Sequence, residues 1–235
     1  MAKAETKRED FEKKIGYSFK NGNILEEALT HRSFLHDNPK WKTTHNERLE
    51  FLGDAVLELG VTRVLYKKYP NNPEGELTAI RAALVNRTML FFVAEEIGIK
   101  PFLHLSRGES KNSDRAREAI LANSMEALIG AIYIDSGIEE AFSFVERFIM
   151  PHLSEVMEKK LYKDSKSELQ EIIQEKNKIT PIYEVMSEAG PDHNKVFKVA
   201  VFAGKKKLAE GVGPSKQEAE TEAAERALKE IKISS

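Results

Sequence analysis

Hydrophobic and acidic positions alternate at helical spacing between residues 46 and 69. The apolar positions form one stripe along the predicted helix: Leu49, Leu52, Val56 and Leu59. Acidic positions form a second stripe beside it: Glu47, Glu50, Asp54 and Glu58. Like charges at this spacing destabilise a helix by roughly 0.2–0.5 kcal/mol per pair. The pattern indicates either a divalent cation held by carboxylate oxygens or a solvated acidic face, the usual setting of a charge run.

The first 160 residues show helical periodicity throughout. It predicts helices over residues 8–15, 23–31, 46–69, 74–96, 120–134 and 138–160. Asn23 is the expected N-cap of the second helix, and Pro151 is expected to interrupt the last. Residues 31–44 and 106–117 have the composition of loops.

The predicted helix over residues 120–134 is apolar on nearly every side, so we expect it to be buried. Asn123 and Glu126 are its polar exceptions. A buried carboxylate is costly unless it is paired or bound to a metal. One interpretation is that Arg48 or Arg81 pairs with Glu126. The other, which we favour, is a metal site shared with the acidic stripe.

The pattern changes near residue 162. A helix over residues 166–176 is followed by alternating, strand-like runs at 182–186, 196–202 and 207–211, and by a helix over 215–231 capped by Ser215. This α-β-β-β-α order fills about 70 residues, enough for an independent small domain. We therefore predict an all-α domain over residues 1–161 followed by a small α+β domain over residues 162–235.

Composition excludes several classes of protein. The chain is 41% hydrophobic, with no apolar run long enough to span a bilayer. Its first ten residues are polar and mixed in charge, unlike a signal or transit peptide. The lack of cysteine excludes disulfides and thiolate chemistry and favours a cytoplasmic setting. The net charge of −2 gives no support for nucleic-acid binding, so such a partner requires local patches. A di-iron oxidase would need a Glu-x-x-His pair on the core helices, which the sequence lacks.

The run Glu47-Arg48-Leu49-Glu50-Phe51-Leu52-Gly53-Asp54-Ala55 closely resembles the nine-residue signature of the ribonuclease III family. Residues 28–34 and 120–135 resemble two further segments of that family. The C-terminal part is similar to a double-stranded RNA-binding domain, through residues 190–193 and 211–216. The resemblance covers essentially the whole chain, in the order of a bacterial ribonuclease III.

This resemblance implies a metal-dependent endoribonuclease that acts on double-stranded RNA as a homodimer, in the processing of ribosomal and other RNA precursors. The family leaves 5′-phosphate and 3′-hydroxyl ends with two-nucleotide 3′ overhangs. It implies the following roles for residues of this chain: metal ligands Glu50, Asp54, Asn123 and Glu126, of which Asp54 and Glu126 are catalytic, a further acidic residue Glu47, and Phe51 inserted into the partner subunit. The metal expected is Mg²⁺, with Mn²⁺ as a substitute, in a pair of ions roughly 4 Å apart. For Phe51 the alternative is a core aromatic.

Asn123 departs from the family pattern, which usually has aspartate at that position. Asparagine keeps one carbonyl oxygen but loses a negative charge and an acceptor, so weaker metal binding is expected. Glu50, Asp54 and Glu126 are intact, which favours an active enzyme with an altered metal requirement. The alternative is a double-stranded RNA-binding form with impaired cleavage.

In the second domain, the resemblance implies RNA contacts at six positions. Ser167, Gln170 and Glu171 would meet one minor groove, Pro191 and His193 the next, and Lys216 the phosphates at a helix N-terminus. The family usually has a basic cluster at that helix start, where this chain has Lys216-Gln217-Glu218 and then Glu220. We expect lower RNA affinity and a flatter salt dependence as a result, with the lysines at 205–207 in partial compensation.

Overall fold

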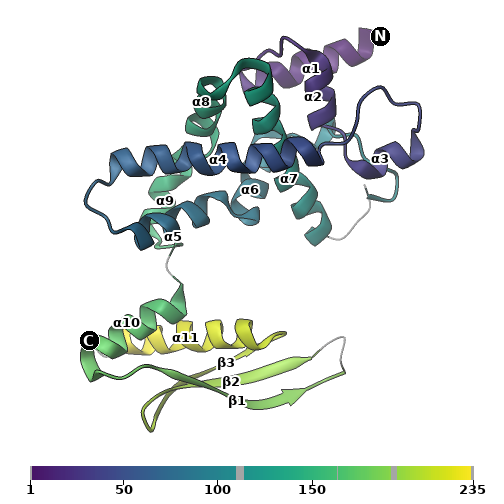
Figure 1. The fold of residues 1–235 in the computed structure, drawn as a ribbon. Helices are drawn as coiled ribbons and strands as arrows, with labels where there is room; N and C mark the ends of the chain where they lie inside the picture. The colour runs from purple at the N-terminus through teal and green to yellow at the C-terminus, as the bar shows by residue number, and fades with distance from the viewer. Residues whose placement is uncertain (1, 110–113, 163, 192–194, 234–235) are drawn as a thin grey trace. The chain divides into compact units, whose positions relative to one another are not determined.

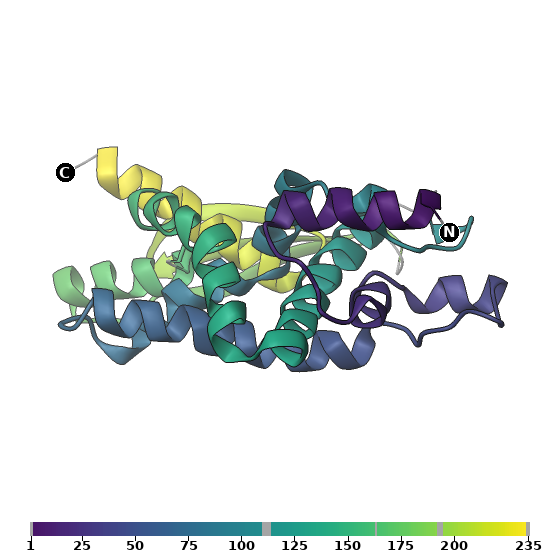
Figure 2. The same cartoon turned by 90° about the horizontal axis from the view of Figure 1, so that it is seen from above.

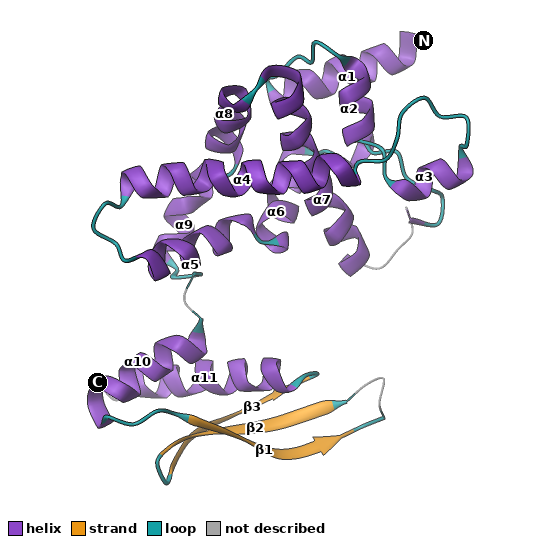
Figure 3. Cartoon of the chain, in the orientation of Figure 1, coloured by secondary structure: helices purple, strands orange, loops and turns teal. Residues whose placement is uncertain are grey.

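The computed structural model describes residues 2–109, 114–162, 164–191 and 195–233. The chain divides into two compact units, residues 1–162 and 163–235, and the boundary predicted from sequence lies one residue earlier. Helices make up the first unit, whereas all the described strands belong to the second (Figure 3). The predicted fold class, an all-α domain followed by an α-β-β-β-α domain, is confirmed.

Two long helices, α4 (Glu47–Lys68) and α7 (Asp114–Ser136), cross at the centre of the first unit (Figures 1 and 2). Gly53 and Gly130 are buried at this crossing. A Cβ atom on Gly53 would lie 1.7 Å from the carbonyl oxygen of Glu126, and one on Gly130 would lie 2.2 Å from that of Leu49. The two backbones therefore touch where only glycine fits, and this contact sets the positions of the polar residues beside it.

Shorter helices surround this pair. In chain order they are α1 (Ala2–Ile15), α2 (Gly22–Ala28), α3 (Arg32–Asp37), α5 (Glu74–Val85), α6 (Arg87–Ile97), η1 (Lys100–Phe102), α8 (Ile138–Phe148), η3 (Met150–His152) and α9 (Leu153–Glu158). α1 lies on the opposite side of the unit from α4 (Figure 2). Except for α3, which has no buried residue, these shorter helices share one core with α4 and α7, in which Phe11, Leu57, Leu84 and Leu128 are fully buried.

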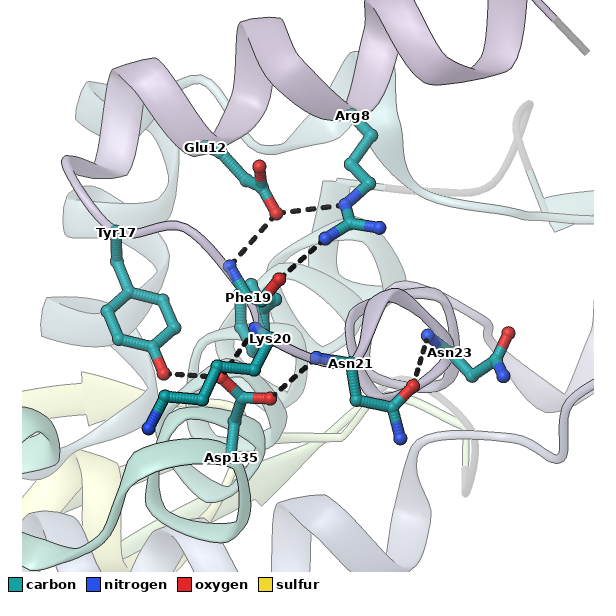
Figure 4. Close-up of polar contacts among 8 residues, drawn as sticks. All are labelled: Arg8, Glu12, Tyr17, Phe19, Lys20, Asn21, Asn23 and Asp135. Atoms are coloured by element: carbon teal, nitrogen blue, oxygen red, sulfur yellow. Dashed lines mark hydrogen bonds and ion pairs between the residues drawn. The ribbon is translucent and has the colours of Figure 1, made fainter.

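Asp135, near the end of α7, joins that helix to the turn before α2 (Figure 4). Its carboxylate accepts hydrogen bonds from the Tyr17 hydroxyl at 2.6 Å and from the backbone N–H groups of Lys20 and Asn21, each at 2.9 Å. The side chain of Asn21 accepts from the N–H of Asn23 and caps α2. The prediction of Asn23 as the cap was therefore wrong by two residues.

Further predictions of local structure were wrong, including the loop over residues 106–117, because α7 already begins at Asp114. The single helix predicted over residues 74–96 is broken at Asn86, whose backbone is extended and whose side chain accepts from the N–H of Met89 at 2.9 Å. Residues 31–44 include the short helix α3, capped by His31. At Asn86 and at His31, a side chain that accepts a hydrogen bond starts a helix, and apolar periodicity carries no signal of such a start.

Leu59 does not belong to the buried face of α4. It is 55% exposed, and Phe51 and Tyr66 are exposed on the same helix at 82% and 75%. The core-facing side is carried by Leu49, Val56 and residues beside them. The sequence stripe drifts around the helix because its spacing departs from 3.6 residues per turn, so its last member leaves the core.

The second unit consists of α10 (Ser165–Asn177), β1 (Ile182–Ala189), β2 (Val196–Ala203), β3 (Lys206–Gly213) and α11 (Lys216–Ile233). The strands pair antiparallel in the order β1-β2-β3, and both helices cover one face of the sheet (Figure 1). Leu169, Val201 and Leu228 lie in its core with a row of small alanines. The close approach of α11 depends on Gly211, where a Cβ would lie 2.3 Å from the carbonyl oxygen of Ala219.

Within the described residues, no single helix is long and apolar enough to cross a membrane. α5 and α6 together reach that length and composition, but they are bent by 43°. Ile80, Leu84 and Leu90 of this pair are buried in the core of the first unit.

Candidate active site and RNA-binding surface

The α4–α7 crossing brings together the four residues predicted as metal ligands. Glu50 and Asp54 lie one turn apart on α4, on either side of the residue whose backbone touches α7. Asn123 and Glu126 lie almost one turn apart on α7. The Asn123 amide Nδ2 donates a hydrogen bond to Glu50 Oε1 at 2.8 Å, so the two helices are linked through these side chains.

The electrostatics of this cluster disfavour a full set of negative charges. The pKa of Glu126 is raised to about 7, first by burial and then by the nearby carboxylates of Asp54 and Glu50, against an opposing effect of Arg87. Burial also raises the pKa of Glu50, and the hydrogen bond from Asn123 acts in the opposite direction. A cation placed among these oxygens would reverse both effects.

The alternative in which an arginine pairs with Glu126 is not observed. Arg81 donates to the hydroxyl of Thr62 at 3.1 Å, and Arg48 is exposed on the other side of the signature run, near Glu27. In the part of the chain that the structure describes, Glu126 forms no ion pair. The basic side chain that lowers its pKa is Arg87, at the start of α6. Sequence reasoning missed Arg87 because the helix break before it was not predicted.

The oxygen donors of this cluster suit a hard divalent cation. Two carboxylates and an amide oxygen accompany Glu126, and Mg²⁺ is commonly held by one or two carboxylates while it keeps several waters. Among the described residues, no three histidine, aspartate or glutamate side chains already lie close enough together to hold one metal ion. Glu47 is peripheral, since it pairs with Arg32 at 3.3 Å and with His45 at 3.7 Å. The donor chemistry therefore fits, although the side chains are not preset around one point.

Phe51 faces away from this cluster. At 82% exposure it is not a core aromatic, so that alternative is wrong. Beside it lies a pocket of about 640 Å³, lined by Ile24, Leu52 and Ile134 among others. An exposed ring next to an apolar pocket on the same surface is typical of an interface between subunits.

The residues predicted to contact RNA lie on the surface of the second unit. Ser167, Gln170 and Glu171 are exposed along α10, and Pro191 is exposed after β1. Lys216 is exposed at the first position of α11, with its Nζ atom 5.9 Å from the centroid of the Phe197 ring. His193 lies outside the described residues.

The acidic residues at the start of α11 have structural partners. The hydroxyl of Ser215 accepts from the N–H of Glu218 at 3.2 Å and donates to the Glu218 carboxylate at 3.0 Å, so Ser215 caps the start of α11 and holds Glu218 there. Glu220 pairs with Lys166 of α10 at 2.6 Å. Lys207 pairs with Glu210 at 3.0 Å, so the lysines at 205–207 compensate less than their number indicates.

Comparison with known proteins agrees with this arrangement. Residues 21–153 match the family described as Ribonuclease-III-like, and residues 165–231 match the double-stranded RNA binding motif. The chain is 44% identical to Ribonuclease 3 of Carboxydothermus hydrogenoformans over 221 residues, which is 94% of each chain. The chain belongs to the ribonuclease III family. It is a ribonuclease III-type endonuclease with a double-stranded RNA-binding domain.

Other relatives give the same result. Ribonuclease 3 of Borreliella burgdorferi is 43% identical over 93% of this chain and 89% of its own length. Among solved structures, the nuclease domain of ribonuclease III from Campylobacter jejuni is 40% identical and superposes with a TM-score of 0.55. That match covers 60% of this chain and 94% of the solved one.

Proposed function

We propose that this ribonuclease III-type enzyme hydrolyses double-stranded RNA with the help of Mg²⁺ held at the α4–α7 crossing. The observation that carries the proposal is the grouping of Glu50, Asp54 and Glu126 at the crossing. Glu50 and Glu126 are half-buried there, and neither forms an ion pair with a basic side chain among the described residues. Mn²⁺ is the expected substitute. The substrates are ribosomal and other RNA precursors in the cytoplasm, and the products carry 5′-phosphates, 3′-hydroxyls and two-nucleotide 3′ overhangs.

Each residue of the cluster has a part in this proposal. Asp54 of α4 and Glu126 of α7 would hold Mg²⁺, and Glu50 and Asn123 would add further oxygen ligands. When bound, the ion would lower the pKa of a water molecule and stabilise negative charge on the leaving oxygen. Half-burial of Glu126 strengthens its attraction to a cation, because the local dielectric is lower than that of water. Glu47, which pairs with Arg32, adds negative charge at the edge of the site and does not hold the cation directly.

The RNA-binding domain brings the duplex to this site. Ser167, Gln170 and Glu171 meet a minor groove from α10, the segment with Pro191 and His193 meets the next, and Lys216 meets phosphates. The Ser167 hydroxyl donates to Asp164 at 3.0 Å, which leaves its oxygen free to accept from a ribose 2′-hydroxyl.

The active form is a homodimer. Phe51, Leu59 and Tyr66 form an exposed apolar row on α4, and single chains rarely leave such a row uncovered. The solved nuclease domain from Campylobacter jejuni is described as having structural flexibility in a region involved in dimer formation. We place Phe51 of each subunit in the pocket lined by Ile24, Leu52 and Ile134 of the other.

Cleavage of a long RNA duplex across Mg²⁺ and Mn²⁺ titrations tests the proposed function. Asn123→Asp is the matched variant, because it restores the residue usual in the family. The proposal predicts short, 5′-phosphorylated products from both proteins, at lower cation concentration for Asn123→Asp. Mass spectrometry of the product ends checks the predicted end chemistry.

The presence of Asn123 favours one alternative, a chain that binds duplex RNA but cuts it poorly. In that case Asn123→Asp cuts, while the chain as given binds the same duplex with equal affinity and yields no product at any cation concentration. Cleavage by neither protein contradicts the nuclease function, and failure of both proteins to bind the duplex contradicts the alternative as well.

A further inference from the structure

We propose that Asn123 is a positioning residue that keeps the acidic site stable when no cation is bound. Its amide donates to Glu50, and its neutrality leaves the site with three carboxylates instead of four. This inference rests on the proposed function for the identity of the cation, but its first test is made without any divalent cation.

The contact between Asn123 and Glu50 is placed where it has a large effect. Nδ2 of Asn123 lies 2.8 Å from Oε1 of Glu50, and both side chains are half-buried between α4 and α7. Hydrogen bonds from neutral donors to carboxylates are stronger than bonds between neutral groups, more so away from solvent. Among the described residues, no arginine or lysine forms an ion pair with Glu50, so Asn123 is the only donor observed for this carboxylate.

An aspartate at position 123 would change the cation-free site in two ways. It cannot donate a hydrogen bond when ionised, so Glu50 would lose its partner. It would also place a fourth negative charge at the α4–α7 crossing, directly beside the Glu50 carboxylate that the Asn123 side chain contacts at 2.8 Å. A cation relieves both effects. Asn123 therefore trades affinity for the cation against stability in its absence.

The oxygen of the Asn123 amide is available to the cation. The carbonyl oxygen of Asn123 has no hydrogen-bond partner within the described ranges of the chain, while the amide nitrogen serves Glu50. One side chain can thus hold Glu50 in position and still offer a neutral oxygen ligand. This combination separates folding of the nuclease unit from cation binding.

Urea unfolding of the full chain in EDTA tests the inference. Trp41 is the only tryptophan and packs against Phe34 and His104 in the first unit, so its fluorescence follows unfolding of the nuclease unit. We expect Asn123→Asp to lower the folded-to-unfolded ratio in EDTA by at least tenfold. Asn23→Asp, at an exposed position of the same unit, adds the same charge and is expected to change the ratio less than twofold.

A double-mutant cycle between Asn123→Ala and Glu50→Ala in EDTA isolates the hydrogen bond. We expect the two effects to be coupled by about fivefold. Additive effects, or an Asn123→Asp protein as stable as the wild type in EDTA, would overturn the inference.

Millimolar Mg²⁺ then separates this inference from the proposed function. Mg²⁺ is expected to restore Asn123→Asp to near wild-type stability and to shift the wild type much less, because the aspartate site binds the ion more tightly. If Mg²⁺ shifts no variant, the proposed cation site is wrong, whereas the cycle in EDTA still decides whether Asn123 positions Glu50. Equal shifts in both proteins contradict the trade-off.

Discussion

Glu126 and Asp135 are both carboxylic acids on α7, and their surroundings are opposite. Asp135 accepts three hydrogen bonds, from Tyr17, Lys20 and Asn21 (Figure 4). Although burial raises its pKa, these bonds outweigh burial and hold the pKa below the ordinary value. Glu126 faces Asp54 and Glu50 instead, and its pKa rises to about 7.

This contrast separates a structural acid, Asp135, from Glu126, the acid proposed to be functional. Where the fold itself needs a carboxylate, donors surround it and its charge stabilises the native state. Where the carboxylates are left facing one another, the native state carries a cost that a ligand can remove. Acidic residues of the second unit resemble Asp135, since Glu210, Glu220 and Glu222 each pair with a basic side chain.

The largest expected effect comes from the glycine contact that places Glu126. Gly53→Ala puts a Cβ against the carbonyl oxygen of Glu126, so α4 and α7 must separate, and we expect a loss of about 3 kcal/mol in the free energy of unfolding. Gly75→Ala, at an exposed position in the first turn of α5 where an added Cβ would meet no atom within 4 Å, is the control and should change stability by less than about 1 kcal/mol. Urea unfolding followed by Trp41 fluorescence measures both. Equal effects would show that the crossing tolerates a side chain.

Asp135→Asn tests the satisfied carboxylate. We expect a loss of roughly 2 kcal/mol at pH 7, because an amide replaces a charged acceptor of three hydrogen bonds. The depressed pKa means that the stability from Asp135 is present above its ordinary pKa and is lost as the pH falls through the folded value. The difference between the two proteins should therefore shrink towards low pH. Asp114→Asn, fully exposed on the same helix, should stay within about 0.5 kcal/mol of the wild type.

Glu126→Gln tests the unsatisfied carboxylate and should have the opposite sign. A pKa raised to about 7 means that ionisation of Glu126 costs stability progressively as the pH rises from its ordinary value towards 7. In EDTA at pH 8 the variant should be more stable than the wild type by about 1–2 kcal/mol, after allowance for partial solvent exposure. Below pH 4.5 the two proteins should be nearly equal. A destabilised variant at pH 8 would mean that the Glu126 carboxylate has a hydrogen-bond donor or a cationic partner in solution.

The smallest effect concerns a paired acid in the RNA-binding domain. Glu220→Gln removes a negative charge near the start of α11 and releases Lys166, which neighbours Ser167 on α10. We expect duplex RNA to bind several-fold more tightly, with a steeper dependence on salt, because one more lysine can reach phosphates. Glu225→Gln changes the same charge on the same helix at an exposed position and should have less effect. Fluorescence anisotropy at several salt concentrations measures both slopes.

Periodicity was sufficient for the architecture. The spacing of apolar residues predicted α4 and the three strands to within a few residues, because burial of one face dominates those elements. It also predicted α7, but not its first turn and a half, which begins at Asp114 and is polar. It failed where a single polar contact decides, as at Asn86 and His31, whose side chains start helices. It also placed Leu59 in the core, since a stripe read from spacing does not show which edge of the helix meets a neighbour.

The candidate site was predictable in part. The acidic stripe and the polar pair in an apolar helix indicated which residues to bring together, and the resemblance assigned their roles. The hydrogen bond from Asn123 to Glu50 was not predictable, because it depends on the crossing of helices far apart in sequence. The position of Arg87 was not predictable, because it depends on the helix break at Asn86. The contacts between Ser215 and Glu218 explain one departure from the expected basic cluster, and they are visible only in the structure at the start of α11.

Cleavage of a long RNA duplex over a Mg²⁺ titration, with the wild type, Glu126→Gln and Asp135→Asn compared well below their unfolding temperatures, tests the central claim most directly. The account predicts no cleavage in EDTA, saturable cleavage by the wild type and by Asp135→Asn at similar rates, and a loss of at least about 100-fold in Glu126→Gln. Cleavage by Glu126→Gln at the wild-type rate, or cleavage that needs no divalent cation, would contradict it.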